Sequence, residues 1–155
     1  MSPQKNQYQA YSIATRTVAK TRQIVMLYDG AIRFLKQAQT AIAEKRIEDR
    51  FRLLSRAADV VVGLQNSIDF ENGGEVASTL HKFYINMCMR IHAINFNPKD
   101  SAKLCDNAIE ELKQMRNVWD NIDHTLNTAE NAGIAPLPGL ASGNTASNGN
   151  VTLSA

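Results

Sequence analysis

The sequence predicts an all-α protein: an antiparallel four-helix bundle with an N-terminal arm and a disordered C-terminal tail. Apolar residues recur at helical spacing through four segments, and β-branched runs separated by turn residues are absent. Glycine and proline are scarce before Asn131. With 155 residues, 44% of them hydrophobic, the chain has the length of one domain with a substantial core. We expect an arm over residues 1–16, a bundle domain over 17–128 and a tail over 129–155.

The N-terminal residues 1–16 are polar apart from a few side chains such as Tyr8, Tyr11 and Ile13. These are too few for a helix with a core of its own, so we expect an arm that packs on another part of the protein. A first helix is expected from about Val18 to Ala43, because apolar residues keep to one face there.

The second expected helix follows a short polar break at residues 44–48 and runs to about Asp69. Short connections of this kind make consecutive helices antiparallel neighbours. Gly73 and Gly74 mark a stop, since glycine adopts the left-handed conformation that ends a helix without a Cβ clash. A third helix is then expected over about residues 75–94.

Pro98 ends the third helix because proline has no amide proton and disfavours helical geometry in the residue before it. Asp100 or Ser101 can cap a fourth helix, whose apolar face continues to Leu126. From Asn131 onward the chain is mostly Gly, Ala, Ser, Asn and Pro, which bury too little apolar surface to offset chain entropy. This composition predicts a disordered tail.

The second helix carries more apolar surface than one buried face requires. A first stripe contains Phe51, Leu54, Ala58, Val61 and Val62, and a second, at the same spacing, contains Leu53, Ala57, Val60, Leu64 and Ile68. Together they form an arc of roughly 200°, whereas a helix with one buried face needs little more than about 100°.

Two interpretations fit this second stripe. The helix is either the most buried of the bundle, with its second face covered by the N-terminal arm, or the stripe forms a groove for an amphipathic or extended partner segment. In the second case Tyr84, Cys88 and Ile91 of the third helix border the groove. Both hold if the arm occupies the groove until a partner displaces it.

The charge is unevenly distributed although the net charge is only +2. Residues 1–60 hold 11 basic and 5 acidic residues, and residues 61–155 hold 6 and 10. The basic residues at positions 45–56 suggest an alternative function as an all-α regulatory or nucleic-acid-binding module. Interspersed acidic residues and the lack of aromatic residues among them favour a solvated face instead.

The sequence shows no motif typical of catalysis or metal binding. It has no Glu-x-x-His pair of the di-metal bundles, no Gly-rich phosphate loop and no nucleophile elbow. Cys88 and Cys105 lie within helical patterns without C-x-x-C spacing, which predicts buried reduced thiols. We therefore expect neither enzymatic activity nor a metal or other cofactor.

The chain shows no signal for a membrane or for secretion. No run approaches 18 uncharged apolar residues, and the N-terminus lacks the apolar region and cleavage site of a signal peptide. We expect a soluble, cytoplasmic protein with no membrane insertion.

Several motifs, in their order and spacing, point to one family. They are Met26-Leu27-Tyr28-Asp29-Gly30-Ala31, the turn from Asp69 through Gly73-Gly74-Glu75-Val76-Ala77, Leu80 with Tyr84, Asn95 with Asp100, and Trp119. With these motifs the chain resembles the flagellar secretion chaperones of the FliS family from about Tyr8 to Ile122. The chain departs from the family pattern in two places. Ala19-Lys20-Thr21-Arg22 replaces the family's usual start of the first helix, and Ile85 and Met89 are apolar where polar residues are expected.

The resemblance implies a cytosolic export chaperone with a four-helix bundle. Such a protein binds the disordered C-terminal segment of flagellin, prevents premature polymerisation and delivers flagellin to the flagellar export gate. An anti-sigma factor is a further partner to consider, and no nucleic acid is implied. The resemblance also implies that the N-terminal arm, here with Tyr8 and Tyr11, lies in part of the groove when the partner is absent.

Overall fold

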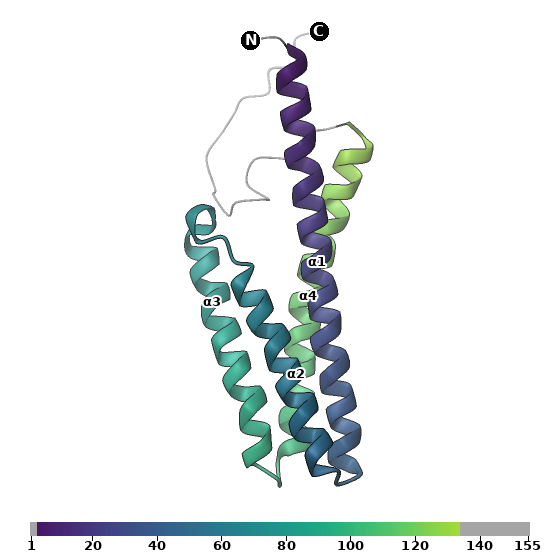
Figure 1. The fold of residues 1–155 in the computed structure, drawn as a ribbon, viewed down its shortest axis with the longest axis vertical. Helices are drawn as coiled ribbons and strands as arrows, with labels where there is room; N and C mark the ends of the chain where they lie inside the picture. The colour runs from purple at the N-terminus through teal and green to yellow at the C-terminus, as the bar shows by residue number, and fades with distance from the viewer. Residues whose placement is uncertain (1–2, 134–155) are drawn as a thin grey trace.

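The computed structural model describes residues 3–133, apart from some side chains near the N-terminus. This part of the chain forms four α-helices and one short 3₁₀-helix, and it contains no strand (Figure 1). The elements are α1 (Pro3–Ala43), α2 (Ile47–Asn66), α3 (Phe70–Ala93), η1 (Ile94–Phe96) and α4 (Ser101–Asn131). The predicted all-α fold of four packed helices is confirmed. Residues 129–131, expected in the tail, belong to α4, residues 132–133 form a turn after it, and the rest of the predicted disordered tail lies outside the described residues.

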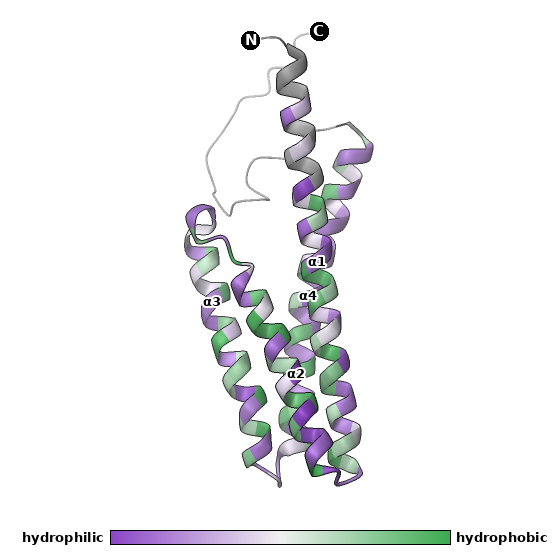
Figure 2. Cartoon of the chain, in the orientation of Figure 1, coloured by the Kyte–Doolittle hydropathy of each residue, from purple (hydrophilic) through white to green (hydrophobic). Residues whose placement is uncertain are grey.

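The long α1 is the central helix of the bundle, since it packs against both α2 and α4, whereas α3 packs mainly on α2 (Figure 1). In the coloured part of each helix, hydrophobic and hydrophilic residues both recur, as they do in amphipathic helices (Figure 2). The hydrophobic core lies where these apolar faces meet, and all four helices contribute fully buried side chains, among them Leu35, Leu54, Met87 and Leu112.

The first helix begins earlier than the sequence indicated, at Pro3 rather than at about Val18. Proline is tolerated at the first helical position, because its missing N–H would have no intrahelical acceptor there. Once a helix is anchored in a core, each further residue adds a hydrogen bond without a new nucleation step. The polar N-terminal residues thus extend α1 although they have no core of their own.

Polar contacts between α1 and α4 fix the antiparallel register of these two helices. Thr21 Oγ1 donates to Asp123 Oδ1 at 2.7 Å, and Arg116 Nε donates to Asp29 Oδ1 at 2.8 Å. This register brings the end of α4 level with about residue 13 of α1 at 1.5 Å rise per residue. The first turns of α1 therefore project past the rest of the bundle (Figure 1).

The helix α3 begins with a single helical turn that is followed by a kink. Asp69 caps this turn, because its Oδ1 accepts from the backbone N–H groups of Glu71 and Asn72 at 3.1 Å. Gly74 then departs from helical geometry with φ 51° and ψ −132°. The predicted stop is therefore present at Gly74, but the four residues before it are helical. A Cβ on Gly73 would lie 2.6 Å from the Cβ of Ala77, so the turn packs tightly here.

Candidate partner-binding groove

An apolar groove of about 280 Å³ lies between the first half of α3 and the middle of α4, and α1 contributes to its floor. We call it the α3–α4 groove. Beside it, the turn end of the α2–α3 hairpin stands apart from α1 and α4 (Figure 1). Most of its lining side chains are apolar: Ile24 from α1, Ile68 before α3, Val76, Ala77, Leu80 and Tyr84 from α3, and Met115, Val118, Trp119 and Ile122 from α4.

The two walls of the groove present apolar surface to solvent. Val76 on α3 and Val118 on α4 are each 51% exposed, although both line the same groove. Leu80, Met115 and Trp119 are half-buried beside them. A concave apolar surface with exposed side chains on both walls is suited to an apolar segment of a partner.

The rim of the groove is polar and carries both signs of charge. Lys20 and Thr17 of α1 line one side, and Asp69 lines another. The pKa of the Asp69 carboxyl is lowered, chiefly by hydrogen bonds from the side chain and backbone of Asn72, and the charge of Lys20 adds a smaller effect. The rim therefore offers a cation and an anion to a segment that lies across it.

Two tyrosines and a tryptophan form the polar part of the floor. The hydroxyl groups of Tyr28 and Tyr84 share a hydrogen bond of 2.7 Å, and burial is the main cause that raises the pKa of each phenol. The Trp119 indole lies close enough to oppose part of this rise. Its buried N–H nevertheless has no hydrogen-bond partner of ordinary geometry within the described part of the chain.

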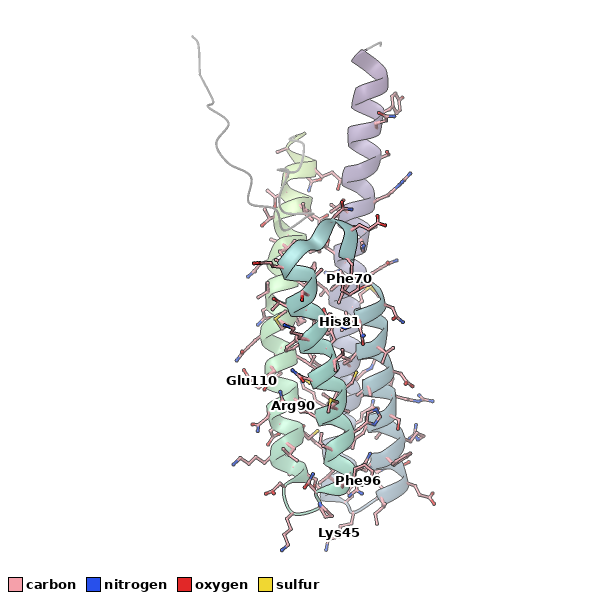
Figure 3. All side chains as sticks on the ribbon, turned by 90° about the vertical axis from the view of Figure 1, so that its left-hand side faces the viewer. Lys45, Phe70, His81, Arg90, Phe96 and Glu110 are labelled. Atoms are coloured by element: carbon pink, nitrogen blue, oxygen red, sulfur yellow. The ribbon has the colours of Figure 1, made fainter. Side chains whose placement is uncertain are left out.

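Two contacts hold the walls that surround the groove. Asp123 of α4 is 3% exposed, and the hydrogen bond that it accepts from Thr21 ties α1 to α4 at the upper end of the groove. Asp123 also accepts a hydrogen bond from Asn127 Nδ2 at 3.3 Å. Towards η1, Arg90 of α3 makes two hydrogen bonds to the carboxylate of Glu111 on α4, at 2.6 and 2.7 Å. Figure 3 shows Arg90 on the side of α3 that faces α4. The seam between α3 and α4 is therefore bridged below the groove and open above it.

Four of the predicted partner-binding residues are buried in the core: Leu53, Ala57, Leu64 and Ile91. The helix α2 lies against both α1 and α3, so most of its second apolar stripe is covered by these two helices rather than by the N-terminal arm, whereas Phe51 and Val62 of the first stripe are exposed. Side chains buried in this way offer no surface to a partner in the present conformation. Their partner-binding role stays a prediction.

The other predicted residues differ in their position. Ile68 and Tyr84 line the α3–α4 groove, at its edge and on its floor. Val60 and Cys88 are half-buried and pack against the core without lining the groove. Cys88 and Cys105 are free thiols, and Cys105 is fully buried. Of the predicted partner-binding residues, Ile68 and Tyr84 line the α3–α4 groove, and the others lie in the core or pack against it.

The N-terminal arm is helical rather than folded onto the groove. Tyr8 is 80% exposed and belongs to the part of α1 that projects past α4. Tyr11 and Ile13 lie in the same helix, and their side chains are outside what the structure describes. Competition between the arm and a partner therefore stays a prediction.

The apolar period of α3 and α4 predicts core positions for most of the groove residues. Val76, Leu80, Met115, Trp119 and Ile122 follow the apolar period of α3 and α4, and a period alone does not reveal that the two helices stand apart. Val118 is the exception, because it is apolar next to Trp119 but off the main face of α4.

Two other exposed apolar residues lie outside the groove. Ile85 is 38% exposed and Met89 is 65% exposed, and neither lines the α3–α4 groove. Within residues 3–133 no helix is both long enough and apolar enough to cross a membrane.

Comparison with known proteins gives a consistent result. A family model described as "Flagellar protein FliS" matches residues 1–126. The chain is 30% identical over 120 residues to the flagellar secretion chaperone FliSB of Pseudomonas aeruginosa, an overlap of 76% of this chain and 94% of the relative. It is 30% identical over 110 residues to flagellar secretion chaperone FliS of Vibrio cholerae (69% and 79%), and 27% over 124 residues to that of Campylobacter jejuni (79% and 95%). The chain therefore belongs to the FliS family of flagellar secretion chaperones, a non-enzymatic family.

Proposed function

We propose that this protein is a cytoplasmic export chaperone that holds the disordered C-terminal segment of flagellin in the α3–α4 groove. By covering that segment it prevents premature polymerisation, and it delivers flagellin to the flagellar export gate. One observation carries the proposal: an apolar groove whose opposite walls expose Val76 and Val118. Membership of a secretion-chaperone family supports it. An anti-sigma factor is a further candidate partner, and the proposal includes no nucleic acid and no membrane insertion.

The size of the groove limits how tightly it alone can bind. Burying the exposed half of Val76 or Val118 is worth about 1 kcal/mol, because a fully buried valine contributes about 1.5 kcal/mol or more. With similar contributions from Leu80, Met115 and Trp119, the groove supplies roughly 5 kcal/mol. Ordering a disordered segment costs about 2 to 5 kcal/mol. A micromolar complex, which needs about 8 kcal/mol net, therefore requires contacts outside the groove as well.

The nucleic-acid alternative gains little support from the basic residues at the start of α2. Arg46 Nε lies 2.6 Å from the carboxylate of Glu44 and also pairs with Asp49, whose other oxygen lies 3.3 Å from Arg52. Arg50 contacts Asn95, and Arg56 lies over the Phe34 ring. Acidic residues thus stand among these cations, whereas a phosphate-binding patch gathers cations on one face.

The proposal is tested with flagellin from the same organism. Isothermal titration calorimetry compares intact flagellin with flagellin that lacks its C-terminal segment, and the isolated segment is titrated separately. We expect the intact protein and the segment to bind and the shortened flagellin not to bind. Binding of the segment should also change the fluorescence of Trp119, the single tryptophan of the chain. Equal binding of intact and shortened flagellin would overturn the proposal.

A further inference from the structure

We propose that residues 134–140, which follow α4 and lie outside the described residues, dock in the α3–α4 groove of the same molecule and compete there with the export partner. The competition rests on the proposed function, whereas the docking itself does not. The family match ends at residue 126, so this segment belongs to a part of the chain that the match does not include.

The spacing of apolar residues in this segment fits an extended, groove-bound conformation. Ile134, Leu137 and Leu140 recur at every third position, and Pro136 and Pro138 stand between them. Prolines favour the polyproline II helix, which has three residues per turn and a rise of about 3.1 Å per residue. In that conformation the three aliphatic side chains lie on one face. The segment thus presents an apolar ridge that an apolar groove can take up.

The end of α4 directs the chain and sets its reach. Gly133 has φ +68°, the left-handed conformation that turns the chain away from a helix, and its N–H donates to the carbonyl of Glu130 at 3.0 Å. From Gly133, Leu140 lies about 22 Å away in polyproline II geometry. Val118 lies about 22 Å back along α4 at 1.5 Å per residue. A segment that folds back beside α4 therefore places Leu140 level with the groove wall.

Charge and the position of the N-terminal arm favour this occupant. Residues 134–155 contain no Asp, Glu, Lys or Arg, so no charged side chain needs to be desolvated in an apolar groove. The N-terminal arm is the other candidate segment of this chain for occupying the groove. It continues α1 as a helix with Tyr8 80% exposed, and it would have to unwind before it could reach the groove.

Tethering makes even a weak contact effective. A short flexible connection gives an effective concentration of about 1 mM. Because the prolines already favour the bound conformation, ordering offsets little of the groove's contribution, and the free peptide is expected to bind with a Kd of about 1 mM. The tethered segment then occupies the groove in about half of the molecules, and a competing partner binds about twofold more weakly than it would bind an open groove.

The test uses three variants of the full chain. Leu137→Asp/Leu140→Asp disrupts the apolar ridge, a stop after Gly133 removes the segment, and Val151→Asp/Leu153→Asp is the matched control with the same change in charge farther along the tail. The first readout is Trp119 emission without any partner. We expect emission at longer wavelength in the first two variants and unchanged emission in the control. Calorimetry with the flagellin C-terminal segment should show binding about twofold tighter in the first two variants only.

The outcomes separate this inference from the proposed function. If all forms give the same emission and bind the flagellin segment equally, the docking inference is wrong while the proposed function stands. If the emission shifts as expected but no form binds the flagellin segment, the docking stands and the proposed function fails. An emission difference that appears only at high protein concentration would mean that a second copy supplies the segment, which overturns docking within one molecule.

Discussion

Val118→Asp is the substitution that most sharply separates binding from folding. Val118 is 51% exposed on α4, where it forms a wall of the α3–α4 groove. An aspartate at this position can remain hydrated in the free protein, so the helix should form and pack almost as before. In the complex the same carboxylate would face an apolar segment. The cost of the substitution therefore arises mainly on binding.

The magnitude follows from two contributions. Losing the burial of the exposed half of the valine costs about 1 kcal/mol of binding free energy. Desolvating a carboxylate without a partner costs more, and about 2 kcal/mol is a conservative figure because the site is at the edge of the groove. Together these give about 3 kcal/mol, or an affinity roughly a hundredfold weaker.

Isothermal titration calorimetry with the flagellin C-terminal segment measures this loss. Val62→Asp is the matched control, because Val62 is 43% exposed on α2 and does not line the groove. Urea unfolding should show that both variants keep most of their stability. Wild-type affinity in the Val118 variant together with a large loss in the Val62 variant would refute the assignment of the groove.

Three further predictions concern the stability of the bundle. Tyr28→Phe and Tyr84→Phe should each cost about 1 to 3 kcal/mol by leaving a buried hydroxyl without its partner, and the double variant should cost less than the sum; additive costs in urea unfolding would contradict the shared hydrogen bond. Burial raises the pKa of the Cys105 thiol from 9.0 to about 12. The contribution of the protonated thiol to the free energy of unfolding is therefore intact below about pH 9 and is lost above it at about 1.4 kcal/mol per pH unit. Cys105→Ala should therefore flatten the fall in unfolding free energy between pH 9 and 11, and an equal slope in both proteins would argue against a buried protonated thiol. Gly63→Ala should raise the free energy of unfolding by about 1 kcal/mol, because a Cβ at this position in α2 would meet no atom within 4 Å; a lower urea midpoint would show an unrecognised contact.

The sequence predicts the helices well because each has a strong apolar period and clear breaks. The break before α2 and Pro98 before α4 fall where the structure has connections, and Gly74 falls at the kink within α3. The start of α1 is missed, since a polar segment that propagates from an anchored helix has no apolar period to detect. The helical turn before Gly74 is missed as well, because the cap on Asp69 stabilises four residues that composition assigns to a loop.

The site is harder to predict than the fold because it depends on how helices are spaced. The second stripe of α2, with Leu53 and Leu64, looks surplus when a helix is expected to bury a single face. In the structure α2 contacts both α1 and α3, and the stripe is buried between them. Conversely, the period of Leu80 and Trp119 predicts core positions, yet the seam between α3 and α4 opens beside them. Local periodicity shows that a face is apolar, but it does not identify what covers that face.

Photo-crosslinking from the groove wall tests the central claim most directly. A photoreactive residue is placed at position 118, or at position 62 as the control, and the protein is irradiated in complex with intact flagellin. If the α3–α4 groove holds the partner, position 118 should crosslink to the C-terminal segment of flagellin and position 62 should not. Crosslinking from position 62 to that segment, with none from position 118, would contradict the account.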